Sequence, residues 1–301
     1  MIKRILDATA SDFGAMNGAQ LAESIRLAEG RTLAAEAICS SASPIEGISH
    51  GELAAAMGAD LVALDGYDPL SPRISGVGDD LLGDAPLKRY ADLLGRPVGI
   101  NLISAEPEQA ASLGGRLITK VSVDAAVAQG LDCLFLYSRP LQGGTPAMQA
   151  EAAHMVKQRH SDQVMVIGVP SFLKPPPRDA DSYASHRDEI SRLLDSGCAG
   201  VAMPMPGSKQ GWMADRTAAL IDHAHNKGGL VWLFITGSVE GAPASVMHDL
   251  ALLGKQLGAD AFRLDDAGLS GMASPENILA FSLALRGERH TYRRMASSIR
   301  R

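Results

Sequence analysis

The stretch GADLVALD, residues 58–65, opens on a glycine, continues through an apolar run and ends on an aspartate. It follows ELAAAM, which has helical periodicity. Because glycine suits the left-handed position that ends a helix, this unit predicts a helix, a glycine stop and a buried strand. The same pattern recurs at GLDCLFLY (130–137), GCAGVAMP (197–204) and GADAFRLD (258–265). The repeat therefore predicts helix–strand units spread along the whole chain.

Four more short apolar runs lie between these units: TLAAEAI (32–38), PVGINLI (97–103), VMVIGVP (164–170) and LVWLFIT (230–236). Most of the eight runs are continuously apolar, which is typical of parallel strands covered on both faces. A doubly wound sheet would fit fewer strands and would not require such even spacing. The pattern predicts a (β/α)8 TIM barrel.

The remaining segments divide the chain into three parts of a single domain over residues 1–301. Residues 1–30 form an N-terminal helical segment, in which 11–29 are expected to be an extra helix, capped by Ser11, that plugs or flanks the barrel. Residues 31–285 form the barrel. Residues 286–301 form a basic C-terminal extension with six arginines and one acid. We expect this extension to dock on protein, either its own barrel or a partner subunit's.

Composition excludes several classes of protein. The net charge of −6 disfavours nucleic acid as the main partner. The longest apolar runs are strand-sized, so the sequence predicts no membrane span, and no signal peptide is evident at the N-terminus. The three cysteines, Cys39, Cys133 and Cys198, suggest reduced thiols. These features predict a cytoplasmic protein, with a homo-oligomer left open.

Polar side chains gather where the predicted strands end, which is the face that carries barrel active sites. Glu36, Asp65 and Asp265 end three strands that are neighbours in a closed barrel, Asn101 ends the next, and Lys209 follows the 197–204 strand. We predict that these five residues are catalytic. Three carboxylates so close together repel one another unless a cation or a shared proton intervenes.

That cluster leaves alternatives open. The same three carboxylates, Glu36, Asp65 and Asp265, could hold Mg²⁺ or another divalent cation, or two of them could act as a general acid/base pair. Alternatively, Asp65 simply caps the loop that follows its strand, and Asp266 bonds backbone amides in its own turn. No organic cofactor is evident.

Two loops suggest a ligand. TGSVEGA (236–242) and DDAGLSG (265–271) follow the last two predicted strands, where barrels frequently hold phosphate on backbone amides. Gly237, Ser238, Gly268, Ser270 and Gly271 are therefore predicted to bind phosphate. The alternative is a pair of tight turns that need glycine for their geometry alone.

Other candidates carry weaker signals. Lys174 could pair with an anionic substrate, and Arg73 lies in a long Gly- and Pro-rich loop, 67–86, of the kind that forms lids or substrate walls. His50 could be a general base or a capping residue. Cys39 is expected to be a small buried filler.

The blocks SDFGAMNGAQLAESIRLAEGRT (11–32), GELAAAMGADLVALDGYD (51–68) and DDAGLSGMASPENILAFSLALRGERHTYRRMA (265–296) resemble a family of uncharacterised bacterial barrel proteins. Members often carry a label as haloacid dehalogenase-like hydrolases, which implies an Asp-x-Asp motif after the first strand. Here that strand ends Glu36-Ala37-Ile38, and the similar spelling at Asp179 and Asp181 falls before a helix. The family is also similar to phosphate-binding barrels of the phosphoenolpyruvate mutase type, although the cysteine loop of isocitrate lyases is absent.

Together these features predict an enzyme that binds a small phosphorylated carbohydrate or organic acid and performs acid/base chemistry, as an isomerase, epimerase or aldolase-type lyase. One alternative is a metal-dependent hydrolase that uses the same carboxylates. Another is a non-catalytic sensor that keeps the barrel and its anion pocket.

Overall fold

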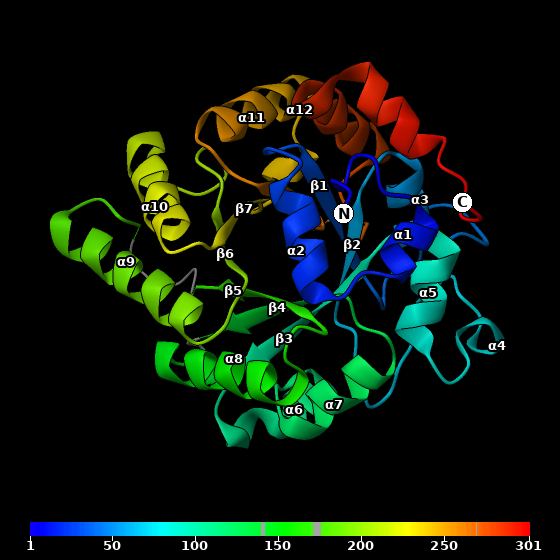
Figure 1. The fold of residues 1–301 in the computed structure, drawn as a ribbon, viewed down its shortest axis with the longest axis horizontal. Helices are drawn as coiled ribbons and strands as arrows, with labels where there is room; N and C mark the ends of the chain where they lie inside the picture. Colours follow the sequence, from blue (N-terminus) through cyan, green and yellow to red (C-terminus); the bar gives the residue numbers. More distant parts are fainter. Residues whose placement is uncertain (140–141, 171–175, 269) are drawn as a thin grey trace.

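The computed structural model describes residues 1–139, 142–170, 176–268 and 270–301, and its strands form a closed parallel barrel (Figure 1). Each strand pairs with the next along the chain, and β8 pairs with β1. The strands are β1 Thr32–Ile38, β2 Leu61–Asp65, β3 Val98–Ser104, β4 Cys133–Ser138, β5 Met165–Val169, β6 Gly200–Pro204, β7 Leu230–Ile235 and β8 Ala261–Leu264. The predicted TIM-barrel fold is confirmed.

Helices surround this barrel (Figure 1). They are α3 His50–Ala56, α4 Asp79–Leu82, α5 Pro86–Leu94, α6 Ala110–Leu113, α7 Lys120–Ala128, α8 Pro146–His160, α9 Ala180–Asp195, α10 Ala214–Asn226, α11 Ala244–Gln256 and α12 Pro275–Met295. The repeating glycines have the predicted left-handed backbone, with φ of 102° at Gly58, 92° at Gly130, 102° at Gly197 and 92° at Gly258. A side chain would be strained there, so the glycines end the helices and release the chain into each strand.

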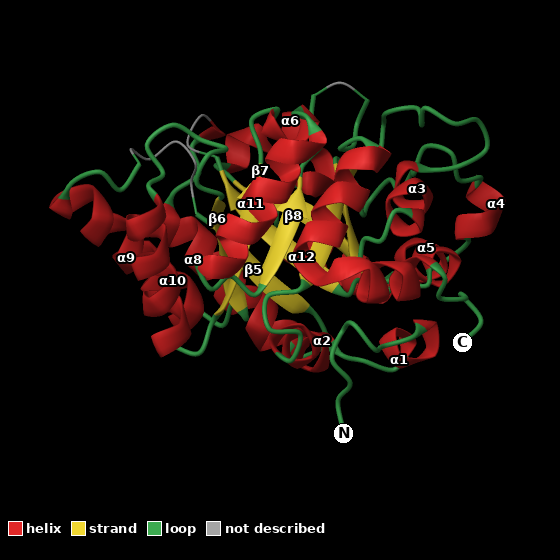
Figure 2. Ribbon diagram, turned by 90° about the horizontal axis from the view of Figure 1, so that it is seen from above, coloured by secondary structure: helices red, strands yellow, loops and turns green. Residues whose placement is uncertain are grey.

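The N-terminal segment closes one end of the barrel. In place of the single helix predicted over 11–29 it forms two short helices, α1 Ala10–Gly14 and α2 Gly18–Arg26, because Asn17 caps a new helix start; both lie beneath the strands in Figure 2. Leu21 and Ile25 are buried in the same core cluster as Trp232 of the barrel interior. The segment therefore plugs the barrel. The capping prediction was wrong: the first helix is capped by Thr9, whose backbone N–H donates to the Asp12 carboxylate at 2.8 Å, and Ser11 lies inside the helix.

The basic C-terminal extension docks on its own barrel at this same end. Helix α12 breaks at Gly287, where φ is 75° and ψ is 171°, one residue beyond the predicted border of the extension. Arg286 and Arg294 lie on either side of the break, and both are buried against Asp60.

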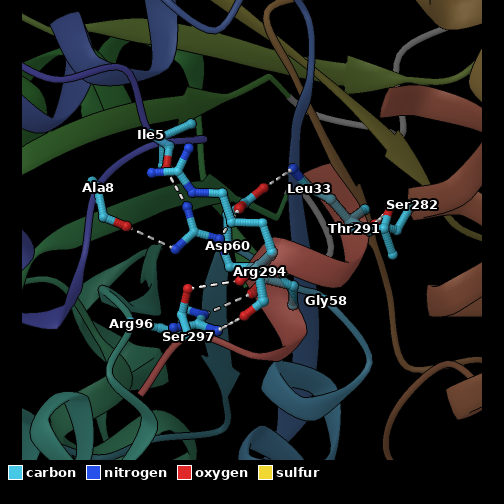
Figure 3. Close-up of polar contacts among 12 residues, drawn as sticks. Ile5, Ala8, Leu33, Gly58, Asp60, Arg96, Ser282, Thr291, Arg294 and Ser297 are labelled. Carbon is cyan, nitrogen blue, oxygen red and sulfur yellow. Dashed lines mark hydrogen bonds and ion pairs between the residues drawn. The ribbon is translucent and has the colours of Figure 1, made fainter. Parts of the chain in front are cut away.

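Asp60 is the centre of a cluster that we call the bottom clamp: Asp60, Arg96 and Arg294, which are labelled in Figure 3, and Arg286, which pairs with Asp60. Arg294 Nε donates to Asp60 Oδ1 at 2.7 Å, and its Nη1 donates to the Ala8 carbonyl at 3.1 Å. The clamp thereby joins the N-terminal segment, the start of β2 and the end of the chain, as the prediction of docking on protein required.

Two expectations from composition can be compared with the described residues. No helix among them is both long enough and apolar enough to cross a bilayer. All three cysteines are buried, and none forms a disulfide.

Candidate active site

The predicted catalytic carboxylates meet at the C-terminal mouth of the barrel. Ala34 and Ala63, two residues before Glu36 and Asp65 on their strands, belong to the interior core, so alternation directs both acids into the barrel. Asp265 directly follows β8 and hydrogen-bonds through its N–H to Ile235 at 3.0 Å. Glu36 is 7% exposed and Asp265 is 8% exposed. The acids thus lie at the base of the mouth.

Arg263, in the middle of β8, binds these carboxylates together. It is fully buried, its Nη2 lies 2.8 Å from Glu36 Oε2, and its Nε donates to Asp265 Oδ1 at 3.0 Å. Nη2 also donates to the Tyr137 hydroxyl. The guanidinium carbon lies 3.8 Å from the centre of the Phe234 ring, so the cation rests on an aromatic floor.

Asn101 links the third carboxylate to this group. Its Nδ2 donates to Glu36 Oε2 at 2.9 Å and to Asp65 Oδ1 at 2.8 Å, and its Oδ1 accepts from Arg263 Nη1 at 3.2 Å. The structure therefore brings Glu36, Asp65, Asn101 and Asp265 into one network around Arg263. We call these five residues, which come from β1, β2, β3 and the end of β8, the mouth cluster.

The mouth cluster has more negative than positive charge, and the pKa values respond. Burial raises the pKa of Glu36, with Asp265 and Asp65 adding to the rise while Arg263 opposes it. Burial likewise raises the pKa of Asp265, against the opposing effects of Arg263 and the Thr236 hydroxyl. Three carboxylates around one guanidinium favour retention of a proton in the cluster.

The arrangement can be tested for a divalent cation. Among the residues that the structure describes, no group of three His, Cys, Asp or Glu side chains is placed to hold a metal ion. The guanidinium of Arg263 supplies positive charge between Glu36 and Asp265. As arranged, the cluster does not fit a divalent cation, so no chemical step is derived through one. The assignment of Glu36, Asp65 and Asp265 to a metal stays a prediction.

Lys209 lies at the edge of the cluster. Burial lowers the pKa of its ammonium group, and the opposing influence of Asp265 shows that the two side chains are within electrostatic reach. The neighbouring Ser208 is committed to the backbone, because its Oγ donates to the Met205 carbonyl at 2.7 Å. Lys174 lies outside the described residues.

The two predicted phosphate loops lie side by side. Loop 7 (236–242) contains consecutive left-handed residues, Gly237 with φ of 74° and Ser238 with φ of 70°. Loop 8 (265–271, described except for residue 269) contains a similar pair, Ala267 with φ of 61° and Gly268 with φ of 66°. A Cβ on Gly268 would lie 3.7 Å from Ser238 Oγ, so the loops are in contact. Left-handed non-glycine residues in both loops indicate backbone strain, which is often concentrated at functional sites.

The loop glycines do not all serve the same purpose. A Cβ on Gly271 would lie 2.6 Å from the Cβ of Ser41, so packing alone requires glycine there, whereas Gly268 has room for a Cβ. Ser270 Oγ donates to the Met272 carbonyl at 3.3 Å. Phosphate binding by these loops stays a prediction.

Glu240, in loop 7, was missed by the sequence reasoning. It is 1% exposed, and its Oε1 accepts from the backbone N–H of Ala267 at 3.0 Å. Asn277 fixes the same residue from the other side, because its Nδ2 donates to the Glu240 carbonyl at 2.8 Å. A carboxylate of the protein therefore occupies the backbone amide next to Gly268, in a loop for which the sequence predicts phosphate binding.

Arg263 was missed as well, although a signal for it exists. It stands two residues before Asp265 in FRLD, and the two-residue period of a strand places both on the inward face. A charged residue at an inward barrel position requires a buried counter-charge. Glu240 carries a weaker signal, since an acid in a glycine-rich loop is usually solvated.

The remaining candidates lie around the mouth. His50 is buried at the start of α3, and burial lowers the pKa of its ring. Cys39 is buried, as expected, and burial raises the pKa of its thiol. Arg73 lines a cavity of about 580 Å³ together with Cys39 and Asp68. This cavity shows that part of the 67–86 loop borders open space beyond the ends of β1 and β2.

Family comparison confirms the coarser part of the resemblance. Residues 6–301 match the family described as "Domain of unknown function (DUF7916)". The chain belongs to this family. Its description names no activity and carries no haloacid dehalogenase label. No protein with a curated description matches the sequence.

Solved structures with the same barrel are distant in sequence. An oxaloacetate acetylhydrolase is 13% identical with a TM-score of 0.51, over 84% of this chain and 82% of its own. A deoxyribose phosphate aldolase from Aeropyrum pernix is 14% identical with a TM-score of 0.51, over 87% and 91%. A protein described as a phosphonomutase from Burkholderia cenocepacia is 14% identical with a TM-score of 0.50, over 78% and 88%. At these identities the similarity shows the fold alone.

Proposed function

We propose that this protein is an enzyme that binds a small carbohydrate or organic acid in the barrel mouth and performs acid/base chemistry on it, as an isomerase, an epimerase or an aldolase-type lyase. One observation carries the proposal: two buried carboxyl groups, Glu36 and Asp265, share the guanidinium of Arg263, and half-buried Asp65 joins them through Asn101, all at the C-terminal ends of adjacent strands. Titratable groups with perturbed environments at this face are typical of catalytic sites.

The chemistry follows from unequal protonation. When Glu36 and Asp265 together retain one proton, the protonated carboxyl group is the acid and the ionised one is the base. Both groups contact Arg263. The ionised carboxylate takes a proton from a carbon next to a carbonyl group, and the protonated carboxyl donates its proton to the carbonyl oxygen. This step yields an enol, and the two carboxyl groups have exchanged their protonation states. Return of a proton to a different carbon or face gives isomerisation or epimerisation.

Other residues hold this pair in place. Arg263 is fully buried on the ring of Phe234, so it fixes Glu36 and Asp265 and keeps water from the base of the site. We propose that Lys209, within electrostatic reach of Asp265, pairs with an anionic end of the substrate. Because nothing in this scheme requires a phosphate group, we propose the carbohydrate or organic acid as the substrate class.

Hydrogen exchange tests the proposal without knowledge of the final product. The protein is incubated in D₂O with a panel of aldoses, ketoses, keto acids and hydroxy acids, and ¹H NMR follows deuterium entering carbon positions. The panel includes oxaloacetate and deoxyribose phosphate, since similar barrels are named for them. At least one compound should exchange with the wild-type protein and not with Glu36→Gln.

Glu276→Gln is the matched control, because Glu276 is an exposed acid in the first turn of α12. It should exchange at the wild-type rate. Exchange that persists unchanged in Glu36→Gln would contradict the assigned chemistry.

A further inference from the structure

The turns of loops 7 and 8, each with consecutive left-handed residues, bring backbone N–H groups together at the mouth, and we call this group of amides the anion nest. The sequence predicts phosphate here because glycine and small hydroxyl residues fill the loops after the last two strands. The N–H of Ala267 in loop 8 points to the carboxylate of Glu240 in loop 7, at 3.0 Å. The nest is therefore directed at an anion that belongs to the chain itself.

Further contacts place the Glu240 carboxylate firmly in this nest. The backbone amides of Ser238 and of Glu240 face the same carboxyl group and favour its ionised form, although burial raises its pKa. Asn277 donates to the carbonyl of Glu240 at 2.8 Å and to that of Ala242 at 2.7 Å, so the loop backbone is held on its other side. Glu240 Oε2 is buried with no hydrogen-bond partner among the residues that the structure describes.

The surrounding charge opposes a second anion at the same point. Asp265 lies within electrostatic reach of Glu240, and Asp266 Oδ2 accepts from the N–H of Gly268 at 3.2 Å. A phosphate on these amides would displace one carboxylate and face two others. Like charges in a partly buried site repel strongly, whereas a neutral hydroxyl group meets no such repulsion.

We propose that Glu240 is a specificity-determining residue, which fills the anion nest of loops 7 and 8 and restricts the substrate to molecules that present an uncharged hydroxyl group, rather than a phosphate, at this side of the mouth. This inference rests on the proposed function only in taking the mouth as the substrate site.

The test measures binding of inorganic phosphate by thermal denaturation, at constant ionic strength against chloride. The wild-type protein should show no stabilisation specific to phosphate. Glu240→Ala empties the nest, so its melting temperature should be lower in chloride and should rise by several degrees with phosphate. Glu240→Gln keeps an acceptor of the same size and should not respond. Glu276→Ala, which removes an exposed charge from the nearby start of α12, should behave like the wild-type protein.

Two results would overturn the proposal: phosphate-specific stabilisation of the wild-type protein, or a response of Glu240→Ala no larger than that of Glu276→Ala. If Glu240→Ala does not fold in chloride, it is refolded from denaturant in phosphate. Recovery in phosphate alone supports the proposal, and no recovery in either salt counts against it. Because no turnover is measured, this experiment can fail while the exchange assay succeeds, and the reverse.

Discussion

The two ends of the barrel hold buried charge clusters of opposite composition. At the mouth, the carboxyl groups of Glu36 and Asp265 contact one guanidinium, that of Arg263, and Asn101 links the carboxyl group of Asp65 to them. In the bottom clamp, one carboxylate, that of Asp60, lies among three buried arginines. Both clusters lie at the ends of the same strands, but they differ in what satisfies their polar groups.

In the bottom clamp, backbone carbonyls accept hydrogen bonds from the arginine N–H groups. Arg96 Nη1 donates to Gly95 at 2.8 Å and its Nε to Ala59 at 3.2 Å, while Arg294 Nη1 donates to Ala8 at 3.1 Å. The bonds to Ala59 and Ala8 join distant parts of the chain. The buried charges of the bottom clamp therefore have partners within the protein, and we infer that this cluster stabilises the fold.

The mouth cluster, in contrast, has three carboxyl groups and one guanidinium. Asp65 accepts from Asn101, while Glu36 and Asp265 share the donors of Arg263. Burial raises the pKa values of Glu36 and Asp265 because donors do not fully compensate for lost water. The candidate active site is therefore marked by carboxyl groups whose lost hydration is incompletely compensated, rather than by burial of charge as such.

Asp60→Asn should have the largest effect of the substitutions, because it should destabilise the bottom clamp. It removes the negative charge from among three buried arginines, and breaking a buried pair costs about 3–5 kcal/mol. The melting temperature should fall on the order of 10 °C, while the exchange activity per folded molecule stays unchanged. Differential scanning calorimetry and the D₂O assay measure the two quantities.

Asp195→Asn provides the control for this substitution, because Asp195 forms an exposed pair with Lys227 at 2.8 Å. Exposed pairs contribute little to stability, so its melting temperature should match that of the wild-type protein. An Asp60→Asn protein as stable as this control would show that the bottom clamp does not hold the chain ends.

Arg263→Lys should have the converse effect, with a smaller loss of stability and a larger loss of activity. A lysine ammonium cannot reach Glu36, Asp265 and Asn101 at the same time as a guanidinium does. We expect a stability loss of about 1–3 kcal/mol from the missing hydrogen bonds. The exchange rate should fall about 100-fold, because the acid and base lose their alignment.

The pH profile distinguishes this role from a purely structural one. If Arg263 controls the protonation of the carboxyl groups, the pH dependence of exchange should shift in Arg263→Lys. A lower rate with an unchanged profile would mean that the arginine serves only to pack the barrel interior.

The strand positions could be predicted from the sequence because local chemistry decides them. Gly58 and its three equivalents have a left-handed backbone, which glycine favours, and each precedes an apolar run. The helix ends and the strands could therefore be located from the sequence. Glu36, Asp65 and Asp265 could then be grouped, since barrel closure places their strands side by side. In the N-terminal segment the cap was misplaced, Ser11 instead of Thr9, and the single helix expected over 11–29 is two helices, the second capped by Asn17.

The partners of those acids could not be predicted in the same way. Arg263 interrupts an apolar strand, and periodicity alone does not reveal that its inward position faces three acids. The contact between Glu240 and Ala267 joins two loops, and it depends on left-handed turns at Ser238 and Ala267 that their residue types do not demand. Loop backbone conformation and contacts between loops are properties of the folded barrel, so the ligand chemistry of the mouth was the least predictable part.

We expect the mouth cluster to keep a carboxyl proton at pH values at which ordinary carboxylic acids have lost theirs. A ¹³C NMR titration of side-chain carboxyl carbons measures this directly, with Glu36→Gln and Asp265→Asn used to assign the two resonances. We predict that Glu36 and Asp265 titrate above their usual pKa values, in coupled steps, because burial disfavours a second and third negative charge around Arg263. Both groups titrating at their usual acidic values would contradict the account, since the cluster would then hold no acid for catalysis at neutral pH.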